Sequence, residues 1–246
     1  MKVGLFIPCY VNQFYPQVGI ASYNLLTSLG VEVSYPLGQT CCGQPMANSG
    51  YACDAAETEK HFVSLFKDAD YIVSPSGSCT AQVREHFNEI EQNDVVQKVK
   101  NNTYEICEFL YKILKMERVT TAYFPHKVAL HQSCHGLRGL RLGPCSEKMQ
   151  SFTPIVQNYL ENVKGMELIK PKRSDECCGF GGTFAVTEEA VSVKMGNDRV
   201  LDYLANGAEV ITATDMSCLM HLEGLIKRNN YPLKIKHITE ILTGKN

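Results

Sequence analysis

Short runs of β-branched residues alternate with longer amphipathic stretches along the 246-residue chain. This pattern is typical of βαβ units built around a mainly parallel sheet. It predicts strands near residues 2–8, 31–35, 70–74, 127–132, 165–169 and 208–213. It predicts helices near residues 16–29, 54–68, 79–91, 102–116, 147–162, 187–205 and 217–228. We therefore expect an α/β fold with mainly parallel sheets.

The order of these segments occurs twice. Residues 2–9 and 127–134 both read as a strand that begins with Lys-Val and leads to a cysteine. Residues 70–79 and 209–218 both read as a strand that leads to Ser-Cys. We interpret the chain as two pseudo-symmetric βαβ-type repeats and predict domains at 1–117 and 118–246. The stretch 117–126, which contains Pro125, is the natural boundary between them.

The cysteines follow the same duplication. The triplet Cys-Cys-Gly occurs at 41–43 and at 177–179, and each copy has one cysteine well before it and one well after it. The flanking cysteines follow predicted strands, and the carboxyl ends of parallel strands share one edge of a sheet. The sequence therefore predicts metal sites at the carboxyl ends of the strands, with two quartets of ligands: Cys9, Cys41, Cys42 and Cys79, and Cys134, Cys177, Cys178 and Cys218.

Local sequence supports thiolate ligands in both quartets. Ser78 and Ser217 are good N-cap residues, so Cys79 and Cys218 are expected in the first turns of helices, where the dipole favours the ionised thiol. The glycine of each triplet permits positive φ and a close approach of the backbone. Neighbouring cysteines that serve one site suit a multi-iron cluster better than a single tetrahedral zinc ion.

Composition restricts the remaining classes of function. Net charge is −2 with no run of like charges, so nothing indicates a nucleic-acid partner. No apolar stretch approaches the roughly 18 residues needed to span a bilayer, and the N-terminus lacks the features of a signal peptide. We expect a cytoplasmic protein, where structural disulfides are rare. Eleven cysteines in that setting indicate metal ligands, redox groups or buried apolar fillers.

In this order, the cysteines resemble the cysteine-rich CCG domain, which occurs twice in the cysteine-rich component of heterodisulfide reductase and is also found in the iron–sulfur component of glycolate oxidase. Three segments more specifically resemble the lactate utilization protein A family: residues 6–14 (Phe-Ile-Pro-Cys-Tyr-Val-Asn-Gln-Phe), 76–79 (Ser-Gly-Ser-Cys) and 177–184 (Cys-Cys-Gly-Phe-Gly-Gly-Thr-Phe). The resemblance implies an iron–sulfur electron-transfer subunit of a multi-protein system that oxidises L-lactate, a 2-hydroxy acid, to pyruvate. It implies a non-autonomous oxidoreductase subunit, with a ferredoxin-like iron–sulfur protein and a further lactate-utilization subunit as partners. Catalytic residues are not identified.

The chain departs from the wider family at two positions. The family pattern often ends each repeat in Cys-x-x-Cys, but Ser76 and Asp215 stand three residues before Cys79 and Cys218. Four thiolates remain in each half, a set that suits a [4Fe–4S] cluster, and the chain could hold one or two. Ser76 and Asp215 are candidates for an auxiliary oxygen ligand.

His131 and His135 flank Cys134, and a histidine beside a cluster cysteine could ligate, transfer a proton or tune the site by hydrogen bonding. Of the two, His135 is the candidate for an auxiliary role.

Three alternatives stay open at this point. The cysteines could form structural Cys₄ zinc sites. The paired cysteines could act directly in a thiol or heterodisulfide reductase. The chain could also be a scaffold whose centres only stabilise contacts with its partners. Outside the quartets, Cys53 and Cys107 lie in apolar helical settings and are expected to fill the core.

Overall fold

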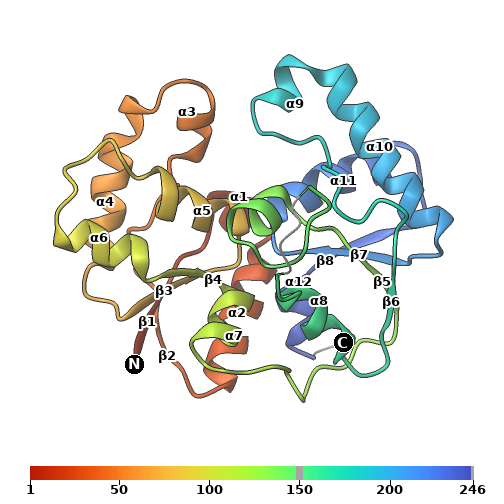
Figure 1. Ribbon diagram of the computed structural model, residues 1–246, viewed down its shortest axis with the longest axis horizontal. Coiled ribbons are helices and arrows are strands. Elements are labelled where there is room, and N and C mark those ends of the chain that lie inside the picture. Colours follow the sequence, from red (N-terminus) through yellow and green to blue (C-terminus); the bar gives the residue numbers. More distant parts are fainter. Residues whose placement is uncertain (148–151, 245–246) are drawn as a thin grey trace.

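The computed structural model describes residues 1–147 and 152–244 and has an α/β architecture with two all-parallel, four-stranded sheets (Figure 1). The first sheet has the order β2-β1-β3-β4, with β1 at Lys2–Leu5, β2 at Glu32–Ser34, β3 at Tyr71–Ser74 and β4 at Thr103–Glu105. The second has the order β6-β5-β7-β8, with β5 at Lys127–Leu130, β6 at Glu167–Ile169, β7 at Val210–Ala213 and β8 at Lys234–His237. The same strand order in both halves confirms the predicted fold class and its pseudo-symmetry.

The helices lie between the strands in sequence. The first half contains α1 (Cys9–Phe14), α2 (Pro16–Ser28), α3 (Gln44–Asn48), the 3₁₀ turn η1 (Cys53–Ala55), α4 (Ala56–Phe66), α5 (Gly77–His86), α6 (Asp94–Asn101) and α7 (Ile106–Lys112). The second contains the π-helical turn η2 (His135–Gly139), α8 (Ile155–Glu161), α9 (Phe184–Thr187), α10 (Glu189–Ala205), α11 (Met216–Arg228) and α12 (Ile238–Leu242). Within the described residues no helix is both long and apolar enough to cross a bilayer.

The six predicted strands are present, but β4 and β8 were not predicted. β4 occupies the start of the stretch 102–116, which reads as one amphipathic helix, and only its later part forms α7. β8 is a sheet edge in which Lys234 and Lys236 are exposed and Ile235 is only half-buried, so the sequence lacks the run of apolar residues of a buried strand. The predicted helix 147–162 is observed only as α8, and its residues 148–151 lie outside the described residues.

The two halves share a hydrophobic core. α12, from the second half of the chain, packs against α2 of the first, and α7 packs against α8 (Figure 1). Leu26 of α2 and Leu242 of α12 are both fully buried members of the same core cluster. The division at 117/118 falls between α7 and β5 and stays a prediction, because a shared core does not define domain boundaries.

Candidate metal centre

All eight repeated cysteines line one cavity of about 420 Å³. It lies at the carboxyl ends of β1, β3, β5 and β7, the inner strands of the two sheets. Both halves therefore face the same space, which sequence spacing alone did not predict. Metal ligation by these thiols stays a prediction. The structure adds that both predicted sites face the same cavity.

In the first quartet, each thiol is positioned by a different local structure. Cys9 begins α1, directly after the segment that leaves β1, and its Sγ lies 3.7 Å from the Sγ of Cys41. Cys42 precedes Gly43, which has a φ of 82° and is the N-cap residue of α3. Cys79 lies in the first turn of α5 and its backbone N–H donates to the Ser76 hydroxyl. Gly43 therefore has the left-handed backbone predicted for it.

The second quartet repeats this arrangement. Cys134 stands at the start of η2 after β5, and Cys218 lies in the first turn of α11. Gly179 has a φ of 86°, and its N–H donates to the Sγ of Cys177 at 3.3 Å. A Cβ at Gly179 would approach the Ser192 carbonyl oxygen to 2.7 Å, so this loop requires glycine for space as well as for its backbone angle.

Within each quartet, each thiol interacts with the next quartet cysteine along the chain. Hydrogen bonds from Cys42 and Cys9 lower the pKa of Cys41, and those from Cys134 and Cys178 lower the pKa of Cys177. The same contacts raise the pKa of the remaining partners, Cys9, Cys42, Cys134 and Cys178. Crowded thiols cannot all ionise, because each thiolate disfavours the next. A bound cation would remove this restriction, so the donor set fits a metal centre.

Ser76 and Asp215 are helix caps at the junction of the two halves. They form an isolated antiparallel bridge with each other, although they occupy equivalent positions in the two repeats. Asp215 accepts from the Ser78 N–H of α5 at 2.6 Å and from the Ser217 hydroxyl of α11 at 2.8 Å. Both residues line the cavity, but their oxygens already serve the helix ends. The predicted caps Ser78 and Ser217 were wrong by two residues, since Ser76 and Asp215 are the observed N-caps.

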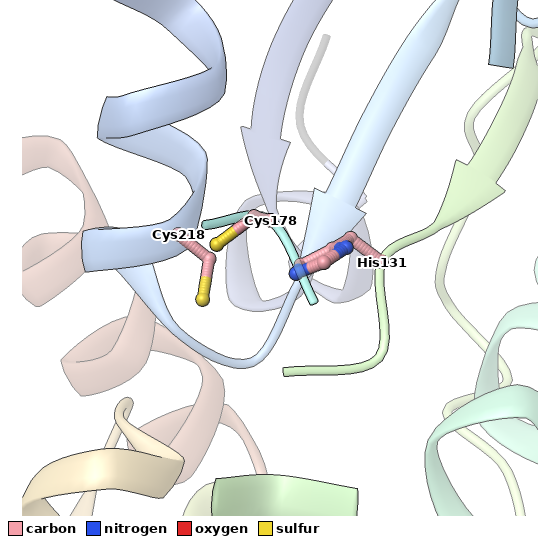
Figure 2. Close-up of side chains that lie close together, drawn as sticks. All are labelled: His131, Cys178 and Cys218. Carbon is pink, nitrogen blue, oxygen red and sulfur yellow. The ribbon is translucent and has the colours of Figure 1, made fainter. Parts of the chain in front are cut away.

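Two histidines flank Cys134, and the buried one has the closer relation to the thiols. His135 is exposed and lines the cavity. His131 is 1% exposed, and a ring nitrogen of His131 and the sulfurs of Cys178 and Cys218 all lie within 4.8 Å of one another. Figure 2 shows the imidazole at the end of its strand, turned toward the two sulfurs. The sequence placed both histidines beside Cys134, and His135 was chosen as the auxiliary site residue. His131 is the one that the structure groups with two of the thiols.

His131 is held as a neutral ring. Burial and the nearby charge of Arg199 lower its pKa to about 3. Its Nδ1 lies 2.9 Å from the Tyr203 hydroxyl, whereas its Nε2 is buried with no hydrogen-bond partner among the described residues. Within the described part of the chain, this nitrogen is thus left without a protein partner beside two of the thiols.

The cysteines outside the quartets divide between core and surface. Cys107 is a fully buried residue of α7, which confirms the prediction for it, and Cys145 is also buried. Cys53 is exposed, so its predicted place in the core was wrong. The short turn η1 directs it outward, whereas Ala55 of the same turn is the buried residue.

Comparisons with known proteins agree with this geometry. The model of the cysteine-rich domain CCG matches residues 3–84 and 128–223, one match in each half. Lactate utilization protein A 1 of Bacillus mycoides (strain KBAB4) is 38% identical over 249 residues, covering 98% of this chain and 96% of that protein. Lactate utilization protein A of Bacillus subtilis (strain 168) is 39% identical over 249 residues, covering all of both chains.

Among solved structures, glutamate racemase isoform RacE1 from Bacillus anthracis aligns with a TM-score of 0.39 and 10% identity, covering 98% of this chain and 78% of that one. That similarity is too low to carry information on function. The matches to full-length relatives and the two matches to the family model do identify the family. The chain belongs to the lactate utilization protein A family of proteins with cysteine-rich CCG domains.

Proposed function

We propose that the chain is an iron–sulfur electron-transfer subunit of a multi-protein system that oxidises L-lactate to pyruvate. The observation that carries the proposal is the convergence of two matched thiol quartets on one cavity. The names of relatives that are 38% and 39% identical over almost their full lengths support the involvement in lactate utilization.

The order of the thiols favours a cluster over a single zinc ion. In each half, two cysteines that are neighbours in sequence, Cys41 and Cys42 or Cys177 and Cys178, line the same cavity. Neighbouring side chains usually diverge, so two of them can serve one tetrahedral zinc ion only from a contorted loop. In a cluster, neighbouring thiolates can bind different irons.

Each quartet would hold one [4Fe–4S] cluster, which when bound supplies one-electron transfer. The chain's own residues bind the cluster and shield it. The N-terminal turns of α5 and α11 place positive dipole ends next to the thiolates of Cys79 and Cys218. Tyr10 and Phe180, one from each half, line the cavity and pack edge to face with their ring centroids 6.1 Å apart.

We also propose that the protein works in the cytoplasm with a ferredoxin-like iron–sulfur protein and a further lactate-utilization subunit. All 11 cysteines are free thiols, which fits a reducing compartment. Two centres at one cavity fit a relay between partners, because each centre can take an electron from one side and release it to the other.

Anaerobic purification followed by iron, acid-labile sulfide and zinc analysis tests the proposal. We expect about four irons per quartet and an EPR signal on reduction. Cys42→Ser and Cys178→Ser should each remove the iron of one quartet, about half of the total. Cys53→Ser is the matched control, since this exposed thiol lies outside the cavity and its loss should leave the iron content unchanged.

A colourless, iron-free protein, even after reconstitution, would overturn the proposal. Stoichiometric zinc in anaerobically prepared material would instead support structural Cys₄ sites. Thiol-dependent turnover by the isolated chain would support a thiol or heterodisulfide reductase. A Cys42→Ser variant that disrupts assembly with partners without changing redox spectra would support the scaffold.

A further inference from the structure

The two quartets differ in the residues that lie behind them. Three positions before Cys9 stands Phe6, and three positions before Cys134 stands His131. Phe6 is fully buried and packs edge to face on two rings of α4, with centroids 4.9 Å from Phe62 and 6.0 Å from Phe66. The first quartet is therefore backed by an apolar aromatic cluster, which also contacts Cys42 and Cys79.

The equivalent positions of the second half are polar. α10 supplies two residues four apart, Arg199 and Tyr203, just as α4 supplies two phenylalanines four apart. The Tyr203 hydroxyl contacts the Nδ1 of His131 at 2.9 Å, and the Arg199 guanidinium lies 4.5 Å from the centre of the Tyr203 ring. Arg199 is fully buried and is paired with Asp202 at 3.1 Å. A phenylalanine triad in one half thus becomes a histidine, tyrosine and arginine triad in the other.

The hydrogen-bond donors and acceptors of this triad fix the proton on His131. The other neighbour of Tyr203 is Arg199, whose guanidinium lies over the phenol ring and donates but never accepts. Of the two groups beside the phenol, only the Nδ1 of His131 can accept its proton. With Nδ1 accepting, the ring carries its own proton on Nε2. This N–H is buried next to Cys178 and Cys218 and has no acceptor among the described residues.

We propose that the Nε2–H of His131 donates a hydrogen bond to a sulfur of the group held by the second quartet and thereby makes the two centres unequal. The inference rests on the proposed function, because it needs a cluster at that quartet. Reduction adds negative charge to the sulfurs, and a donor stabilises that charge. The second centre therefore has the higher reduction potential, and the first, backed by Phe6, the lower. Electrons that enter at the first centre move downhill to the second.

The experiment is a redox titration followed by EPR in a chain that keeps only the second centre, after Cys41→Ser and Cys42→Ser. His131→Phe gives the second half the residue of the first, and we expect a lower midpoint potential with the iron content unchanged. His131→Gln retains an N–H donor and should restore most of the potential. His126→Phe is the matched control, since His126 is exposed at the opposite end of the same strand and should leave the potential unchanged.

Two results would overturn the inference. One is an unchanged potential in His131→Phe with iron still bound. The other is a strong nitrogen hyperfine coupling at the second centre that His131→Phe abolishes, because this would make His131 a ligand rather than a donor. Absence of iron from the second quartet in the unsubstituted protein is a different result, since it contradicts the proposed function. Iron analysis therefore separates failure of the inference from failure of the function.

Discussion

Glu105 is a fully buried carboxyl group at the end of β4. One of its oxygens accepts from the N–H groups of Cys107 and Glu108 and so caps α7, while the other has no partner among the described residues. Burial raises the pKa of Glu105 to about 8 from its usual 4.5, because a carboxylate is less stable away from water, and the nearby Glu108 raises it further. The folded protein therefore holds a proton that the unfolded chain releases at much lower pH.

This difference predicts a dependence of stability on pH. The pKa of Glu105 is higher in the folded protein than in the unfolded chain, so its proton favours the folded state. This contribution to the free energy of unfolding is fully present below pH 4.5 and is lost as the pH rises to about 8. The loss is at most about 1.4 kcal/mol per pH unit. Glu105→Gln should remove this part of the dependence, as measured by denaturant unfolding of the metal-free protein from pH 5 to about 8.5. Glu57→Gln, at an exposed position, should keep it; equal pH profiles for Glu105→Gln and the unsubstituted protein would contradict the prediction.

Single residues also show what the sequence could reveal about the site. The eight cysteines were identifiable because their order is duplicated, and duplication is visible without any structure. The position of His131 beside Cys134 was visible too, but its hydrogen-bond partner was not. That partner is Tyr203, which is 72 positions away in sequence and reaches the ring only through the packing of α10 on the second half. Contacts of that kind leave no local pattern.

At the scale of elements, short strands and turns escaped prediction. β4 has only three residues, and the π-helical turn η2 has no characteristic hydrophobic period from which it could be predicted. The sequence predicts one helix over 79–91. The observed α5 ends at His86, and α6, which was not predicted, begins eight residues later at Asp94. The long, periodic helices α2, α10 and α11 were all predicted within two residues at each end, because a sustained apolar stripe defines them.

Asp215 is the element-scale feature with the clearest energetic consequence. One carboxylate caps α11 in its own repeat and also accepts from the first turn of α5 in the other. Asp215→Ala should therefore cost more than one ordinary cap, about 1–3 kcal/mol of unfolding free energy. Ser76→Ala is the matched comparison, because Ser76 caps α5 alone. Equal costs for the two substitutions in denaturant titrations of the metal-free protein would show that Asp215 does not support both helices.

At the scale of the whole molecule, the shared core connects the two sheets. α2 and α12 come from opposite halves of the chain and bury apolar side chains in the same cluster. The duplicated sequence alone suggests two units that fold separately, since each repeat has its own sheet. The packing of α12 on α2 instead leaves an apolar face of α2 uncovered when the second half is absent.

We therefore expect one cooperative unfolding transition in the metal-free, reduced protein. Leu242→Ala in α12 should lower the stability of both halves together, by about 2–5 kcal/mol, since the side chain is fully buried. Hydrogen exchange at β1 and at β5 provides a probe in each half. Two separate transitions, or faster exchange confined to β5, would show that the halves unfold independently.

The position of α12 also has a consequence for how the protein is made. Translation proceeds from the amino end, so the four thiols of the first quartet are all made by residue 79, long before α12 at Ile238–Leu242. The nascent chain thus exposes these four thiols before the helix that packs on α2 has been made. Under the proposed function, iron delivered at that stage would meet an open, unfinished core. Cofactor insertion is therefore expected after synthesis has passed α12, when the complete fold can retain what it receives.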